Sequence, residues 1–155
     1  MTGIAIHCMI GKHCVSGKVF VDSNILIYAH DTTDQRKHII ALQALKALWA
    51  SKSGVLSMQV LQEFYTVSTR KIANPIPRVE ARDTVEEFSQ WCIEITPKEI
   101  ASAFRIEDTA KISFWDALIV AAAIKAGADE ILSEDMNAGQ TIAGIRITNP
   151  FASTE

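Results

Sequence analysis

Residues 18–28 read KVFVDSNILIY. The apolar run Val-Phe-Val after Lys18 predicts a short buried strand over 18–21. Asp22 follows the strand directly, and the apolar residues 25–28 predict a turn or the start of a helix. The acid is therefore expected at the rim of the core, at the point where the strand ends.

Downstream of this stretch, predicted strands and helices alternate. Strands are predicted at 54–57, 92–95, 131–133 and 145–147. Helices are predicted around 39–49, over 60–68, 78–91 and 117–126, and from Thr96, which is followed by Pro97 and Glu99 in a capping pattern. This alternation favours an α/β fold with three layers, α/β/α, around a central, mainly parallel sheet of about five strands.

Composition leaves several protein classes open and excludes others. A chain of 155 residues with 48% hydrophobic and 21% charged residues fits one globular domain. The net charge of −3 argues mildly against a nucleic-acid partner, but cations bound to clustered carboxylates would reverse the local sign. We find no apolar run of about 18 residues and no secretion-signal pattern, so we expect a cytoplasmic protein without membrane contact.

Residues 1–17 differ from the rest of the chain and contain two His-Cys pairs, His7-Cys8 and His13-Cys14. Two imidazoles and two thiolates are able to bind zinc, but this spacing matches no zinc pattern. A loosely ordered extension or a mis-assigned start is the plainer interpretation, so residues 1–17 stay unassigned. With Cys92 the chain has three cysteines, which favours reduced thiols over a disulfide framework.

Four acidic residues stand near the ends of predicted elements: Asp22, Glu63, Asp116 and Asp135. The carboxyl ends of parallel strands meet at one edge of a sheet, so we expect these acids to share one cleft. Mg²⁺ or Mn²⁺ prefers such oxygen ligands, whereas zinc is disfavoured because no His or Cys lies beside them. Asn24 and Ser133 are expected to support the acids by hydrogen bonds to them or to metal-bound water.

Metal held by carboxylates suits the hydrolysis of a phosphodiester, with one or two ions. Each acid also has a plainer interpretation. Asp116 stands three residues after Ser113 and is able to complete a capping box, Asp22 suits a turn, Glu63 suits a solvated helix face and Asp135 suits a loop. The joint placement of all four acids at one edge favours a site.

Four stretches carry a family resemblance: VFVDSNILIY at 19–28, SMQVLQEF at 57–64, ISFWDALI at 112–119, and LSEDM at 132–136, with ITNPF at 147–151. They resemble the motifs of PIN-domain ribonucleases, and more narrowly those of VapC toxins. The resemblance covers roughly residues 18–151, which it identifies as a nuclease domain. It implies that Asp22, Glu63, Asp116 and Asp135 are the catalytic, metal-binding acids. It also implies an Mg²⁺- or Mn²⁺-dependent endoribonuclease that cuts RNA as the toxin of a type II toxin–antitoxin pair, with a cognate antitoxin and a homodimeric state.

Substrate contacts are harder to predict from the sequence. Several basic residues are available to bind phosphates, namely Arg36, Lys37, Arg70, Lys71, Arg78, Arg82 and Lys111, of which we retain Arg70, Lys71 and Arg78 as candidates. Trp115 suits base stacking, but we expect it to pack in the core. Three other functions stay open: an RNA-processing nuclease that is no toxin, a silent binding module, and a phosphatase or phospho-accepting regulator. The last lacks the paired Asp motif or the Lys that it needs.

Overall fold

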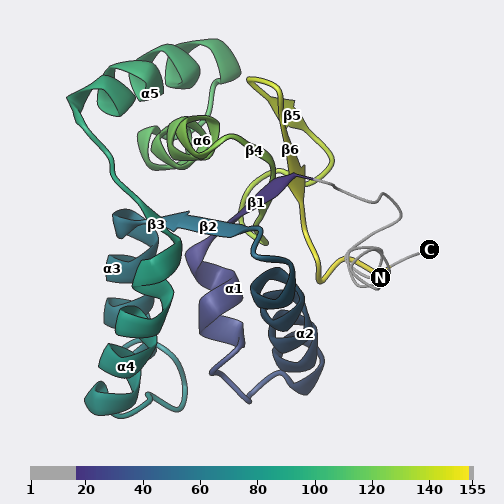
Figure 1. The fold of residues 1–155 in the computed structure, drawn as a ribbon. Helices are drawn as coiled ribbons and strands as arrows, with labels where there is room; N and C mark the ends of the chain where they lie inside the picture. Colours follow the sequence, from purple (N-terminus) through teal and green to yellow (C-terminus); the bar gives the residue numbers. More distant parts are fainter. Residues whose placement is uncertain (1–16, 154–155) are drawn as a thin grey trace.

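A six-stranded sheet forms the centre of the molecule, with the strand order β3-β2-β1-β4-β6-β5 (Figure 1). The structure is a computed structural model, and it describes residues 17–153. The strands are β1 (Lys18–Val21), β2 (Gly54–Ser57), β3 (Cys92–Ile93), β4 (Ala128–Leu132), β5 (Thr141–Ile142) and β6 (Ile145–Thr148). All neighbouring strands pair in parallel except β5 and β6. The mainly parallel sheet is confirmed, with six strands where about five were predicted.

Helices cover both faces of the sheet, as predicted. They are α1 (Ser23–Tyr28), α2 (Gln35–Ser51), α3 (Met58–Ser68), α4 (Arg78–Phe88), α5 (Pro97–Ala110) and α6 (Phe114–Ala126), with a 3-10 turn at Ser89–Trp91. Figure 1 shows α5 and α6 on one side of the sheet and α1 to α4 on the other. None of these helices has the length and apolar character that crossing a membrane would require.

The capping residues explain where several helices begin and end. Thr96 and Glu99 form a complete capping box at the start of α5. The Ser113 hydroxyl accepts the backbone N–H of Asp116 at 3.1 Å and starts α6. Gly127 ends α6 with a φ of 70°, a left-handed conformation that suits glycine.

Several predicted element boundaries differ from the structure, and one strand was not predicted. The helix predicted over 78–91 ends at Phe88, where a 3-10 turn begins that carries Trp91 into a cluster with Trp49 and Phe88. The strand predicted over 92–95 is paired only at Cys92–Ile93, at the edge of the sheet. The β5 strand was missed altogether, because it has only two residues.

The register of the central strands determines what stands at the functional edge. Val21 of β1 is aligned with Leu132 of β4, and the backbone N–H of Asp22 donates to the Leu132 carbonyl at 3.0 Å. Asp22 and Ser133 therefore leave the sheet side by side. Most buried side chains of these two strands are apolar, with Phe20, Val21, Ile131 and Leu132 at 0% exposure, and the buried acid Glu130 is paired with Arg146. A rigid core thus holds both polar residues at its rim.

Candidate active site

Asp22 sits at the end of β1 and caps helix α1 with its own side chain. Its Oδ1 accepts the backbone N–H of Ser23 at 2.7 Å, so the carboxylate is fixed as the helix begins. The residue is only 5% exposed, which is unusual for an acid without a basic partner. The plainer interpretation of Asp22 as a turn residue does not account for this burial.

Asn24 and Ser133 connect Asp22 to Asp135. The Ser133 hydroxyl donates to Asp22 Oδ2 at 2.7 Å, and the Asn24 side-chain nitrogen lies 3.2 Å from Asp22 Oδ2, 3.3 Å from Ser133 Oγ and 3.2 Å from Asp135 Oδ2. Ser133 Oγ also accepts the backbone N–H of Asp135 at 3.2 Å. We call Asp22, Asn24, Ser133 and Asp135 the polar cluster. Asn24 and Ser133 therefore both contact Asp22 and Asp135, two of the four predicted acids.

Burial raises the pKa of the Asp22 carboxyl from 3.8 to about 6. Hydrogen bonds from Ser133 and Ser23 lower it, while the nearby charges of Glu63 and Asp135 raise it further. The fold therefore keeps an acid in a place where its ionised form is costly. Carboxyl groups with shifted pKa values cluster at functional sites, so Asp22 is a candidate site residue.

Glu63 lies on helix α3, on the exposed side, within electrostatic range of Asp22. Its carboxylate has no hydrogen bond or ion pair with any part of the chain that the structure describes. No hydrogen bond or ion pair within residues 17–153 therefore fixes its orientation. Gln59 lies one helical turn before Glu63, on the same face of α3. Its amide nitrogen lies 3.4 Å from the Trp115 carbonyl oxygen.

Asp116 stands in the first turn of α6, beside Trp115, and is half-buried. Its backbone N–H is used by the Ser113 cap, but the reciprocal bond from its carboxylate is absent within residues 17–153, whereas α5 has both halves of the box. The capping-box interpretation therefore accounts for Ser113 and not for the Asp116 carboxylate. The contact between Gln59 and Trp115 brings this end of α6 against the face of α3 that carries Glu63.

No group of three or more acidic, His or Cys side chains in residues 17–153 is already arranged to hold a metal ion. The donor set nevertheless fits Mg²⁺ or Mn²⁺. All the available ligands are oxygens, and no basic side chain within residues 17–153 pairs with the buried Asp22 carboxylate. The two His-Cys pairs considered as a zinc clip lie outside the described residues.

The basic residues predicted to contact phosphates have different surroundings. Arg70, Lys71 and Arg78 are exposed and make no ion pair within the described chain, and they follow α3 or begin α4. Arg70 stands two residues beyond the end of α3, the helix that carries Glu63. Lys37, also considered as a phosphate contact, is instead paired with Glu134.

Two side chains were misjudged or missed from the sequence. Trp115 was expected in the core, yet it is 63% exposed next to Asp116. Ser57 was not selected, although it ends β2 as Asp22 ends β1. Its buried hydroxyl has no hydrogen-bond partner within residues 17–153. Its place as the first residue of the stretch that carries Glu63 is the signal that would have identified it.

Comparisons with known proteins agree with this architecture. Residues 19–141, well over half of the chain, match the PIN domain. Among solved structures, the chain is similar to VapC20 from Mycobacterium tuberculosis, a sarcin-ricin loop cleaving toxin, with 23% identity, a TM-score of 0.57, and coverage of 76% of this chain and 90% of VapC20.

Two protein–DNA complexes also contain similar chains. The match in FitAB bound to the IR36 DNA fragment has 15% identity, a TM-score of 0.63, and coverage of 88% of this chain and 98% of the other. The match in VapBC2 from Rickettsia felis, bound to a promoter DNA fragment, has 16% identity, a TM-score of 0.58, and coverage of 84% and 97%. These similarities support the fold, and no curated protein matches the chain. On the strength of its match over residues 19–141, the chain belongs to the PIN domain family.

Proposed function

We propose that this protein is a divalent-metal-dependent endoribonuclease and the toxin of a type II toxin–antitoxin pair. The observation that carries the proposal is Asp22, an acid with 5% exposure and a pKa raised to about 6, linked through Asn24 and Ser133 to Asp135. The match to the PIN domain family also supports the proposal. A silent binding module would have no need for a costly buried carboxylate at the edge of its sheet.

Asp22 and Asp135 would hold Mg²⁺ or Mn²⁺, with Glu63 and Asp116 completing the oxygen ligands. Such an ion, when bound, supplies a Lewis acid for the phosphoryl oxygen and lowers the pKa of a bound water. Asn24 holds two of the acids at a fixed separation, and Ser133 keeps Asp22 oriented. Glu63 and Asp116 carry carboxylates without partners in the described chain, so no contact there occupies the oxygens that would bind the ion.

RNA is the proposed substrate, since VapC20 is described as a toxin that cleaves the sarcin-ricin loop. Arg70, Lys71 and Arg78 remain candidates for phosphate contacts, because all three are exposed. Trp115 joins them as a candidate for base stacking, given its 63% exposure beside Asp116. The nuclease domain would extend over 18–151, where β1 begins and where the buried Phe151 packs.

A cognate antitoxin protein is the proposed partner, because two of the similar structures, FitAB and VapBC2, contain bound DNA and are named as two-component assemblies. A homodimer and a cytoplasmic location also belong to the proposal. Phe104 and Trp115 are 52% and 63% exposed, and large exposed apolar side chains of this kind suit a protein interface.

The test is RNA cleavage by the purified protein with and without Mg²⁺. We expect cleavage that EDTA abolishes and that Asp116→Asn removes while the fold is retained. Asp108→Asn is the matched control, since Asp108 is an exposed acid on α5 without a partner in the described chain. Cleavage by Asp116→Asn at the wild-type rate would refute the proposal. Cleavage without growth inhibition in cells would favour an RNA-processing nuclease over a toxin.

A further inference from the structure

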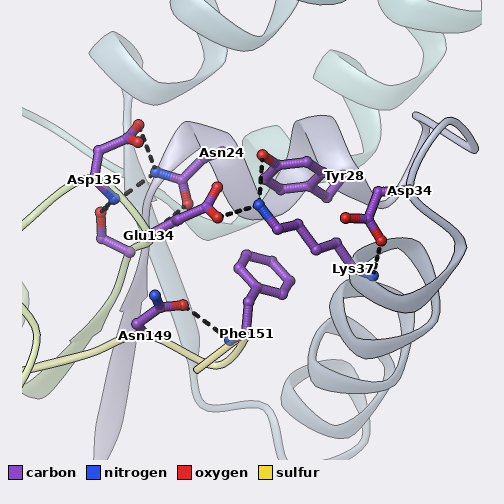
Figure 2. Close-up of polar contacts among 9 residues, drawn as sticks. Asn24, Tyr28, Asp34, Lys37, Glu134, Asp135, Asn149 and Phe151 are labelled. Atoms are coloured by element: carbon purple, nitrogen blue, oxygen red, sulfur yellow. Dashed lines mark hydrogen bonds and ion pairs between the residues drawn. The ribbon is translucent and has the colours of Figure 1, made fainter. Parts of the chain in front are cut away.

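A basic side chain lies close to the polar cluster, at a place that no sequence pattern indicates. Lys37, in the first turn of α2, forms an ion pair with the Glu134 side chain, which comes from the loop after β4. Its Nζ also donates to the Tyr28 hydroxyl at 3.2 Å. Figure 2 shows the lysine extending between Tyr28 and Phe151 toward Glu134.

Two aromatic rings hold the ammonium group in place. Lys37 Nζ lies 4.7 Å from the centre of the Tyr28 ring and 5.7 Å from that of Phe151, distances typical of cation–π contacts. The two rings pack edge to face, with centres 5.0 Å apart. Lys37 therefore connects α2 with α1, with the loop after β4 and with the turn that carries Phe151. The Lys37 ammonium group is thus held by contacts within the protein. A lysine that binds phosphates would instead be expected to extend into solvent.

Glu134 transmits this contact to the polar cluster through its backbone. Its side chain points to Lys37, while its backbone N–H donates to Asn24 Oδ1 at 3.1 Å (Figure 2). The same Asn24 amide contacts Asp22 and Asp135 through its nitrogen. The backbone N–H of Glu134 therefore holds the oxygen side of the Asn24 amide, while Asp22 and Asp135 hold its nitrogen, and that N–H belongs to the residue that Lys37 pairs with.

We propose that Lys37 is a positioning residue: by pairing with Glu134 it fixes the Glu134 backbone against Asn24, and so holds Asp22 and Asp135 in register. Without the pair, the loop over 133–136 keeps its bonds to Ser133 Oγ but loses its tie to α2. The consequence for metal binding and cleavage rests on the proposed function, whereas the ordering of Asn24 does not.

Simple electrostatics predicts that removal of Lys37 strengthens cation binding, whereas the proposal predicts that it weakens cation binding. The sign of the change in Mn²⁺ affinity therefore tests the proposal. Removing Lys37 takes away a positive charge and leaves the Glu134 carboxylate unpaired, so Coulomb attraction alone would strengthen Mn²⁺ binding. Loss of positioning weakens it, because residues that orient metal ligands typically contribute about 10- to 100-fold in affinity. The direction of the change separates the two explanations.

The experiment compares Lys37→Met with Lys37→Arg, Glu134→Gln and the control Lys46→Met. Methionine keeps an apolar stem against Tyr28 and Phe151, and arginine keeps the charge. Lys46 is an exposed lysine on the same helix without a contact in the described chain. Hydrogen exchange of the Glu134 backbone amide is measured in metal-free protein, and Mn²⁺ affinity is measured by calorimetry.

We expect Lys37→Met and Glu134→Gln each to exchange the Glu134 amide several-fold faster and to weaken Mn²⁺ binding by about tenfold or more. The double variant should add nothing, and Lys37→Arg and Lys46→Met should behave as wild type. Unchanged exchange, or Mn²⁺ binding as tight as wild type or tighter, overturns the proposal. Absence of Mn²⁺ binding and RNA cleavage in wild type would refute the proposed function, and the exchange measurement would still decide the role of Lys37.

Discussion

Asp22→Asn should change how stability depends on pH. In the folded protein burial raises the pKa of Asp22 from 3.8 to about 6, so the native state binds a proton more tightly than the unfolded chain. The stabilisation from this proton is fully present below the unfolded pKa of 3.8 and is lost as pH rises through 6. At about 1.4 kcal/mol per pKa unit, the loss amounts to about 3 kcal/mol.

The assay is urea unfolding in EDTA at several pH values between 4 and 8, followed by tryptophan fluorescence. Asparagine does not ionise, so any constant effect of the amide moves the whole curve without changing its slope. We expect the free energy of unfolding of the variant, minus that of wild type, to rise by about 2.4 kcal/mol between pH 4 and pH 7, because at pH 4 the carboxyl of the unfolded chain is already partly ionised. Groups far from Asp22 titrate alike in both proteins and cancel, whereas Glu63 and Asp135 interact with Asp22 and contribute to the difference.

Asp108→Asn serves as the control, because this exposed α5 acid should change the profile little. Adding Mg²⁺ at pH 8 should stabilise wild type and leave Asp22→Asn unchanged, since a ligand that binds the folded state raises its stability. Parallel pH profiles for wild type and Asp22→Asn would refute the reasoning, because they would mean that the carboxylate carries no cost in the folded state.

Three further variants test the site and the fold by urea unfolding. Ser133→Ala removes the hydroxyl that donates to the Asp22 carboxylate and should destabilise the protein by about 1–3 kcal/mol. A cost near zero would show that this hydrogen bond does not contribute to stability. Gly54→Ala places a methyl 2.5 Å from Trp91 and should cost about 1–3 kcal/mol, and a neutral result would contradict this packing. Lys52→Gly relieves a residue with a φ of 55° at the end of α2 and should stabilise by up to about 1 kcal/mol, whereas a loss would argue against that backbone conformation.

The sheet and helices were predictable because the local signals agreed with the tertiary structure. The apolar strand before Asp22, the Thr96-Pro97 helix start and the Gly127 stop all appear where expected. The hairpin of β5 and β6 was not, because its turn at Ala143-Gly144 has positive φ at both residues without the Asn-Gly or Asp-Gly pair that usually marks such a turn.

Only site residues that follow directly after strands could be predicted to lie close together. Asp22 and Ser133 leave neighbouring parallel strands, so their contact was expected from the strand ends alone. The pair of Lys37 and Glu134 was not predictable, since the two residues are separated by 97 positions and a charged helix residue is by default solvated. Trp115 was misjudged for a related reason: aromatic residues usually pack in a core, and the sequence does not reveal which helix face stays exposed.

The most direct test is a crystal structure of the protein soaked in MnCl₂, with an anomalous difference map to locate manganese. The account predicts a peak at the end of β1, within about 2.2 Å of an Asp22 oxygen, with Asp116 or Asp135 oxygens also in contact. Asp22→Asn crystals treated alike should lack the peak. A map without manganese at this edge of the sheet, or with manganese bound far from Asp22, would contradict the central claim.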